Sequence, residues 1–176
     1  MKIYLAGKVA KGAEIGRTLD WRSEYMAKLS RYNNLEFMSP EDPGLDESKP
    51  FEIFGHDCYQ VREADIILIN ASEKLGVGTA QEMVIAKYFN KYVFSILPKD
   101  THHRRSNLQM HAVLVKDWIH PFIYSMSDMI FESLDDFIQH FGQGEKLTLP
   151  FQAKQITIIE EGIAEYIKNC PSADRP

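Results

Sequence analysis

Three side chains in the first half of the chain, Tyr4, Asp57 and Glu82, could together support glycosidic chemistry. When two carboxylates share a cleft, one can attack an anomeric carbon and hold a covalent glycosyl intermediate. The other protonates the leaving group or activates the acceptor, and Asp57 is the candidate for this role. Glu82 suits the nucleophile, because glutamate is ordinarily ionised at neutral pH and the first turn of a helix, where we expect it, favours negative charge. A phenol such as Tyr4 could orient this nucleophile by hydrogen bonding.

The stretch 64–91 is expected to position the candidate nucleophile. Residues 66–69 form a continuous apolar run, too short for a helix and typical of a parallel strand covered on both faces. Gly76 and Gly78 predict a turn that side chains would hinder, and Thr79 is a good N-cap for the helix that follows. A strand that leads through a glycine turn into a helix is where open α/β sheets bind their ligands.

A second strand–loop–helix unit opens the chain, with a strand at residues 2–6 and a basic, glycine-containing loop at 7–12. The loop matches neither a dinucleotide fingerprint nor a P-loop, so a tight turn is its alternative interpretation. The loops after this strand and after residues 66–69 should meet at the carboxyl edge of neighbouring strands. Asp57 would point into the same crevice from the preceding helix. The candidate substrate-binding residues around this crevice are Gly7, Lys8, Gly76, Gly78 and Thr79.

Strands that alternate with helices predict a parallel sheet covered on both sides. We expect a flavodoxin-like, doubly wound α/β fold of about five strands in the order 2-1-3-4-5, with helices on both faces. The predicted strands are residues 2–6, 35–38, 66–69, 91–97 and an edge piece at 118–123. The predicted helices are residues 13–32, 51–63, 79–90, 107–116, 133–141 and 151–169. Residues 1–141 should form this domain, with 142–176 a linker and an amphipathic C-terminal helix packed on it.

The composition is that of an ordinary globular protein, with 176 residues, 44% hydrophobic and 26% charged. The formal net charge of −5 disfavours binding to a nucleic-acid polymer, which needs a basic face. Two cysteines, Cys58 and Cys170, and six histidines show no metal-binding spacing, so neither a metal site nor a disulfide framework is predicted. No stretch approaches the roughly 20 apolar residues of a membrane span, so we expect a soluble cytoplasmic protein that does not bind membranes.

Each candidate also has a purely structural interpretation. The motif T-A-Q-E at residues 79–82 matches a capping box, in which the glutamate would reach back to the N-cap amide. Asp57 beside His56 on a charged helix could be a solvated surface residue. The run H-H-R-R at residues 102–105 could hold a phosphate or could simply belong to an exposed basic loop.

Four sequence motifs stand out in combination. They are I-Y-L-A-G at residues 3–7, the spacing from Asp57 to Asp65 followed by I-I-L-I, G-V-G-T-A-Q-E at 76–82, and F-N-K-Y-V-F-S-I-L at 89–97. Together they resemble the nucleoside 2-deoxyribosyltransferase family, including its relatives the 2′-deoxynucleoside 5′-phosphate N-hydrolases. The resemblance covers residues 1–97 and fades beyond them.

The resemblance implies that Glu82 is the nucleophile, that Asp57 assists proton transfer and that Tyr4 is the tyrosine at the end of the first strand. It further implies a flavodoxin-like fold, no metal and no redox cofactor. It also implies a homo-oligomer, a dimer or larger, whose active sites are completed by a neighbouring subunit.

The chain departs from the family pattern in two places. The family usually has a glycine two residues after the nucleophile, where this chain has Val84, so the packing behind the nucleophile must differ. Members often carry a further aspartate after the third strand, in a region that holds Asn70, Ser72 and Glu73 here.

The leading hypothesis is an enzyme that cleaves the N-glycosidic bond of a (2′-deoxy)nucleoside or its 5′-monophosphate through a covalent intermediate on Glu82. The deoxyribosyl group would pass to another base, although hydrolysis shares the same first half-reaction and stays open. A non-catalytic nucleotide-binding module and an oligomerising scaffold, in which Glu82 is only a cap, are competing hypotheses. Base preference, a 5′-phosphate requirement and 2′-hydroxyl discrimination are not predicted.

Overall fold

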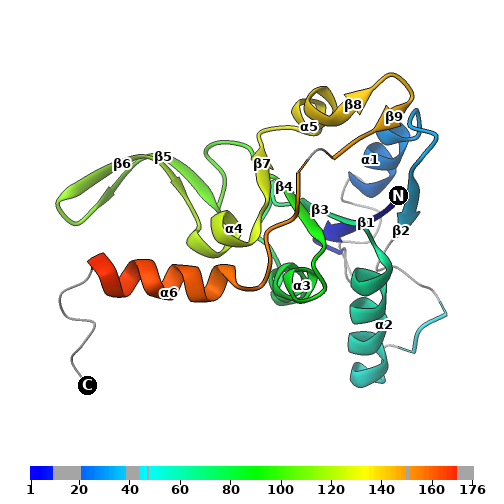
Figure 1. The fold of residues 1–176 in the computed structure, drawn as a ribbon, viewed down its shortest axis with the longest axis horizontal. Coiled ribbons are helices and arrows are strands. Elements are labelled where there is room, and N and C mark those ends of the chain that lie inside the picture. The colour runs from blue at the N-terminus through cyan, green and yellow to red at the C-terminus, as the bar shows by residue number, and fades with distance from the viewer. Residues whose placement is uncertain (10–20, 39–43, 47, 150, 170–176) are drawn as a thin grey trace.

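The computed structural model describes residues 1–9, 21–38, 44–46, 48–149 and 151–169, and its centre is a five-stranded sheet (Figure 1). The strands are β1 (Lys2–Gly7), β2 (Glu36–Met38), β3 (Ile66–Asn70), β4 (Tyr92–Ile96) and β7 (Met129–Phe131). They lie in the order β2-β1-β3-β4-β7, and every neighbouring pair is parallel. This is the 2-1-3-4-5 order of a flavodoxin-like fold and confirms the predicted topology.

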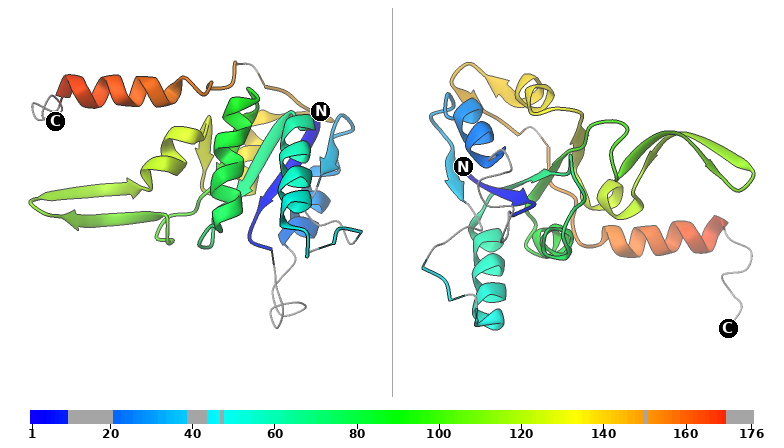
Figure 2. Two further views of the ribbon diagram at one scale, coloured as in Figure 1. Left: turned by 90° about the horizontal axis from the view of Figure 1, so that it is seen from below. Right: turned by 180° about the vertical axis from the view of Figure 1, so that it is seen from behind.

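Helices cover both faces of the sheet, which confirms the doubly wound architecture (Figure 2). They are α1 (Trp21–Leu29), α2 (Pro50–Glu63), α3 (Val77–Tyr88), α4 (Pro121–Met126) and α5 (Leu134–Phe141). A further helix, α6 (Ile158–Asn169), has no buried residue. One core lies between the sheet and helices α1 and α5, and the other lies between the sheet and helices α2, α3 and α4.

The two cores divide the side chains of β1. Ile3 and Leu5 belong to the core beneath α1 and α5, and Tyr4 and Ala6 belong to the core beneath α2 and α3. Successive residues of a strand point to opposite faces, so the register of β1 alone directs Tyr4 toward α2 and α3. These two helices lie side by side on their face of the sheet (Figure 2).

The predicted helix at residues 107–116 is wrong, because this part of the chain forms an antiparallel hairpin. Strands β5 (Arg104–Met110) and β6 (Val113–Ile119) pair with Met110 opposite Val113, which leaves a two-residue turn. His111 in this turn has a φ of 52°, a left-handed conformation that breaks a helix. The β-branched residues that follow favour a strand, and the hairpin extends away from the sheet (Figure 2).

The predicted edge strand or extended piece at residues 118–123 is correct only in part, since Trp118 and Ile119 end strand β6 of the hairpin and do not join the five-stranded sheet. Pro121 begins helix α4, as suits a residue that lacks a backbone N–H and has a helical φ. The fifth strand of the sheet is β7 instead, which pairs Met129 with Phe94 and Ile130 with Ser95. A strand of three residues carries too little periodicity to be recognised from the sequence.

The remaining boundaries differ in smaller ways. The predicted helix at 13–32 is observed as α1 from Trp21, and residues 13–20 lie outside the described residues. The predicted linker contains the short strands β8 (Gly142–Gln143) and β9 (Lys146–Leu147), and the C-terminal helix begins at Ile158 rather than at residue 151. Cys58 is a half-buried free thiol, and Cys170 lies outside the described residues.

Candidate active site

The central strand β1 and helix α3 bring Tyr4 and Glu82 into contact. Tyr4 lies in the middle of the sheet, in register with Met38 of β2 and Ile67 of β3, and it is fully buried. Its hydroxyl donates a hydrogen bond of 2.8 Å to Oε1 of Glu82, which is only 7% exposed. Two residues 78 positions apart in the chain are thus held together by the register of one strand and the packing of one helix.

Helix α3 starts earlier than the sequence suggests. Gly76 is its N-cap residue, without a side-chain hydrogen bond, and the first turn contains no acidic residue. The predicted N-cap at Thr79 is therefore wrong, since Thr79 lies buried within the helix. Glu82 lies in the second turn, whereas a capping box needs the glutamate at the third position of the helix, so the capping-box interpretation does not fit. The dipole argument for its charge also weakens, because the effect falls off within the first turn.

The electrostatic environment of Glu82 differs from that of a surface carboxylate. Burial raises the pKa of Glu82 above its ordinary value, the Tyr4 hydrogen bond lowers it, the charge of Asp57 raises it and that of Arg22 lowers it. Burial and then the negative charge of Glu82 raise the pKa of Tyr4 far above its usual range, so the phenol remains a protonated donor. The pair is thus a buried carboxyl group with a permanent hydrogen-bond donor.

Asp57 projects from α2, the helix that lies beside α3. Its side chain is 32% exposed and therefore reachable from solvent. Its negative charge acts on both Tyr4 and Glu82, which brings the third predicted residue into the same electrostatic neighbourhood. Nδ1 of His56 lies 3.2 Å from Oδ1 of Asp57, so this carboxylate also has a partner on its own helix.

A buried arginine at this edge of the sheet was missed by the sequence analysis. Arg22 of α1 is 4% exposed and donates to the carbonyl oxygens of Leu5 (3.2 Å), Gly7 (3.2 Å) and Lys8 (3.3 Å). Its guanidinium also stacks on the ring of Trp21, 4.4 Å from the ring centroid. Arg22 therefore holds the carboxyl end of β1 with a positive charge at the edge of the site.

One sequence signal could have found this arginine. Arg22, Tyr25 and Leu29 are the buried residues of α1, and their spacing of three and four is that of one helix face. A charged residue in the buried stripe of a helix needs partners for its donors. In this protein those partners are backbone carbonyls at the end of a strand, which the sequence does not reveal.

The loops after β1 and β3 meet as predicted. Nζ of Lys8 forms an ion pair with Oε2 of Glu73 at 3.2 Å, which joins the two loops. Gly7 is packed closely, because a Cβ atom there would lie 2.9 Å from the ring of Trp21 and 3.1 Å from the carbonyl oxygen of Asn70. Asn70 is the final residue of β3, so Gly7 permits the ends of β1 and β3 to approach each other closely.

The two glycines at the start of α3 have a different role from the one predicted. Gly76 has an ordinary φ of −73°, and a Cβ atom at Gly76 or Gly78 would meet nothing within 4 Å. The backbone turn therefore does not require glycine. The absence of side chains at these positions leaves open surface in front of the helix.

The basic loop at residues 99–106 supports the site's framework. Nε2 of His103 accepts a hydrogen bond from the backbone N–H of Leu75 at 2.9 Å. Burial, helped by His102, His120 and Lys74, lowers the pKa of His103 to about 4, so the ring is neutral near pH 7.

The next residue, Arg104, begins strand β5 and forms an ion pair. It is nearly buried and bonds both carboxylate oxygens of Asp117, at 2.9 and 2.7 Å. Neither interpretation of the H-H-R-R run, a phosphate-holding cluster or a simply exposed loop, describes His103 and Arg104.

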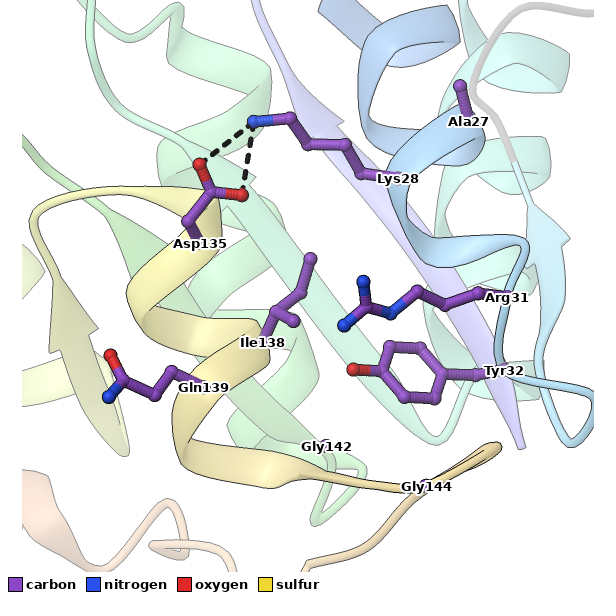
Figure 3. A pocket seen from close by; sticks show the side chains of 9 residues that line it. All are labelled: Ala27, Lys28, Arg31, Tyr32, Asp135, Ile138, Gln139, Gly142 and Gly144. Atoms are coloured by element: carbon purple, nitrogen blue, oxygen red, sulfur yellow. Dashed lines mark hydrogen bonds and ion pairs between the residues drawn. The ribbon is translucent and has the colours of Figure 1, made fainter.

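A separate cavity of about 860 Å³ lies on the other face of the sheet, between α1 and α5 (Figure 3). Nζ of Lys28 and the carboxylate of Asp135 form an ion pair at 3.0 Å on its wall. Its lining includes neither Tyr4 nor Glu82. Its lining residues are Ala27, Lys28, Arg31, Tyr32, Asp135, Ile138, Gln139, Gly142 and Gly144.

The described part of the chain offers no group of three or more His, Cys, Asp or Glu side chains arranged to hold a metal ion. None of its helices is long and apolar enough to cross a bilayer.

Comparison with known proteins identifies the fold. No protein-family model matches the sequence, and no curated protein matches it significantly. The solved structure of the 2-deoxyribosyltransferase of Bacillus psychrosaccharolyticus matches with a TM-score of 0.52 and 17% identity, over 86% of this chain and 100% of that one. At this identity the match establishes a shared fold, so the chain has the α/β fold of a 2-deoxyribosyltransferase.

Two further solved structures match less well. The 2-deoxyribosyltransferase of Leishmania mexicana has a TM-score of 0.48 at 13% identity, over 96% of this chain and 98% of that one. The CMP N-glycosidase BcmB of Clostridium botulinum has a TM-score of 0.48 at 13% identity, over 80% of this chain and 97% of that one.

Proposed function

We propose that this protein cleaves the N-glycosidic bond of a (2′-deoxy)nucleoside or its 5′-monophosphate and transfers the deoxyribosyl group to another base. The observation that carries the proposal is the buried hydrogen bond from Tyr4 to Glu82. A carboxylate that only caps a helix would bond a backbone amide. Here its Oε1 atom is engaged by a residue 78 positions away, in the middle of an interior strand of the sheet.

In the proposed first half-reaction, Tyr4 holds Oε1 of Glu82 and Oε2 attacks C1′ of the sugar. The C1′–N bond breaks through an oxocarbenium-like transition state, and a covalent glycosyl ester forms on Glu82. Asp57 gives a proton to the departing base. In the second half-reaction an acceptor base attacks C1′, the ester bond breaks and Asp57 takes the acceptor's proton.

The charges around the site support a role for Glu82 as the nucleophile and for Asp57 in proton transfer. Burial and the neighbouring carboxylate raise the pKa of Glu82, which makes it a stronger base than a surface carboxylate once it is ionised. The Tyr4 hydrogen bond and the charge of Arg22 act in the opposite direction and favour the ionised form that must attack. The partly exposed Asp57 is placed to exchange protons with a bound ligand.

The fold supports the proposal at the level of architecture, because a solved 2-deoxyribosyltransferase shares it. Loops at the carboxyl ends of β1 and β3 are joined by the Lys8–Glu73 ion pair and lie at the edge where such sheets bind ligands. Gly7, Lys8, Gly76, Gly78 and Thr79 belong to these two loops and to the start of α3, and we propose that they contact the substrate.

The test is incubation with deoxyinosine, with and without adenine, followed by chromatography. New deoxyadenosine identifies a transferase, and free deoxyribose alone identifies a hydrolase. The same assay with deoxynucleoside monophosphates decides the 5′-phosphate requirement. Glu82→Gln should abolish turnover and Glu52→Gln, a matched change on the exposed face of α2, should not.

Two results would overturn the enzymatic proposal. One is full turnover by Glu82→Gln in a protein that still unfolds cooperatively. The other is the absence of turnover on the whole panel while nucleotides still bind, which would favour the competing non-catalytic binding module. Mass spectrometry of the quenched reaction should find the glycosyl adduct on the peptide that contains Glu82.

We also propose that the protein is a homo-oligomer, a dimer or larger. Large apolar side chains are exposed on α2, on α4 and on α6, including Phe51, Phe122 and Ile163, and we infer that contact between subunits buries some of them. Light scattering coupled to gel filtration measures the mass, and a monomer at all concentrations would contradict this proposal.

A further inference from the structure

Helix α2 carries a polar chain that ends on Asp57. Nε2 of Gln60 lies 3.0 Å from Nε2 of His56, and Nδ1 of His56 lies 3.2 Å from Oδ1 of Asp57. Residues four apart are neighbours on a helix face, so the amide reaches the imidazole ring from the following turn. The ring bridges the amide and the carboxylate and is largely shielded, with the side chain 13% exposed.

The orientation of the Gln60 amide favours one tautomer of His56. In this structure the amide nitrogen of Gln60 faces Nε2 of His56, and an amide nitrogen only donates, so the arrangement fits a His56 ring whose Nε2 accepts. The proton of a neutral imidazole then resides on Nδ1. Nδ1–H faces Oδ1 of Asp57 and donates to it.

We propose that His56 is a positioning residue for Asp57 and that Gln60 holds it in the required Nδ1–H tautomer. This inference rests on the proposed function, because it assigns His56 a part in that reaction. With Oδ1 engaged by His56, the proton of Asp57 is carried on Oδ2. Oδ2 gives it to the departing base as the C1′–N bond breaks, and Oδ2 receives the acceptor's proton when the glycosyl ester opens.

The alternative tautomer would disable this arrangement. With the proton on Nε2, the bare Nδ1 lone pair would face a carboxylate oxygen, and two acceptors repel one another. Asp57 would then turn away or bond through its own proton, and the acid would lose its orientation. Gln60 prevents this with a single hydrogen bond on the far side of the ring.

The tautomer is tested without any turnover, by long-range ¹H–¹⁵N NMR of the imidazole nitrogens. We expect the wild type to show a protonated Nδ1 and an unprotonated Nε2 for His56. Gln60→Met, which keeps the side-chain length but removes the donor, should show a partial or complete shift of the proton to Nε2. A proton on Nε2 in the wild type would overturn the inference whatever the enzyme does.

The positioning role is tested by kinetics on the substrate that the wild type cleaves. Gln60→Met and His56→Ala should each lower kcat by about tenfold, the scale of one hydrogen bond, with KM nearly unchanged. His56→Asn places an amide N–H near the position of Nδ1 and should recover most of the lost rate. His111→Asn, on the distant hairpin turn, is the matched control and should match the wild type.

The outcomes separate this inference from the proposed function. If the wild type turns over and both Gln60→Met and His56→Ala match it, the positioning role is overturned and the proposed function stands. An equal loss in His56→Asn and His56→Ala would also overturn it, because a donor near Nδ1 would then be irrelevant. A wild type that cleaves no substrate overturns the proposed function and the catalytic part of this inference together.

Discussion

Replacement of Tyr4 by Phe should destabilise the protein in a pH-dependent way. Phe keeps the ring that fills the core, so no cavity forms, and the only loss is the hydroxyl that donates to Oε1 of Glu82. A hydrogen bond to a charged group contributes about 1.5–3 kcal/mol, and one between neutral groups contributes about 1 kcal/mol. We therefore expect a loss of about 2 kcal/mol in the free energy of unfolding where Glu82 is ionised.

The sign of the pH dependence follows from the shifted pKa. Folding raises the pKa of Glu82 above its ordinary value of 4.5. Protonation of Glu82 therefore stabilises the folded protein at low pH, and this stabilisation is lost as the pH rises through the folded pKa. The Tyr4 hydrogen bond lowers the pKa of Glu82, so in Tyr4→Phe this pKa is higher and the loss of stability continues to a higher pH. The difference between wild type and Tyr4→Phe should therefore shrink to about 1 kcal/mol or less below the unfolded pKa.

Urea unfolding of both proteins near pH 8 and near pH 4 measures these free energies, with equal m-values as the check on two-state behaviour. The same variant should show lower kcat and an acid limb of the pH–rate profile displaced to higher pH. An equal destabilisation at both pH values, or one below about 0.5 kcal/mol at pH 8, would refute the reasoning. It would mean that the hydroxyl does not stabilise the ionised carboxylate.

Two further changes test the framework that holds the site. Lys87→Met should lower the free energy of unfolding by about 3 kcal/mol, because it leaves Asp128 without the ammonium of an ion pair whose side chains are 0% and 1% exposed. Lys99→Met, at a half-exposed ion pair, should cost less than about 1 kcal/mol in the same urea titration, and equal losses would contradict the argument. Gly142→Ala should cost about 1–3 kcal/mol by overpacking, since its Cβ would lie 2.2 Å from the hydroxyl of Tyr32; an unchanged melting temperature would contradict this.

Local pattern was sufficient for the elements that carry the candidate site. The apolar run of β3 is short, continuous and followed by a glycine-containing loop, which only a buried parallel strand explains well. The alternation of strands and helices predicted a parallel sheet covered on both faces, and the expected 2-1-3-4-5 order is one of the two common orders of such sheets. The meeting of the loops after β1 and β3 followed from that order, and the Lys8–Glu73 ion pair bears it out.

Local pattern failed where context outweighed it. Residues 107–116, which the sequence predicts to be helical, lie in the hairpin β5–β6, and β7 is too short to show a periodic pattern. The start of α3 was placed at Thr79 because a threonine with a glutamate three residues later matches a capping box. The helix instead begins at Val77, and its N-cap residue is the exposed Gly76, which has no side chain to form a capping hydrogen bond.

The amino-acid sequence was enough to nominate Tyr4, Asp57 and Glu82, because their types suit one chemistry and the predicted elements bring them to one edge of the sheet. Only the tertiary structure decided that Tyr4 bonds Glu82 in the second turn of α3 and that Arg22 holds the end of β1. Each of these depends on a distance of about 3 Å between atoms, many of them far apart in the chain. Register and packing determine such distances, whereas periodicity along a sequence records only which face a residue occupies.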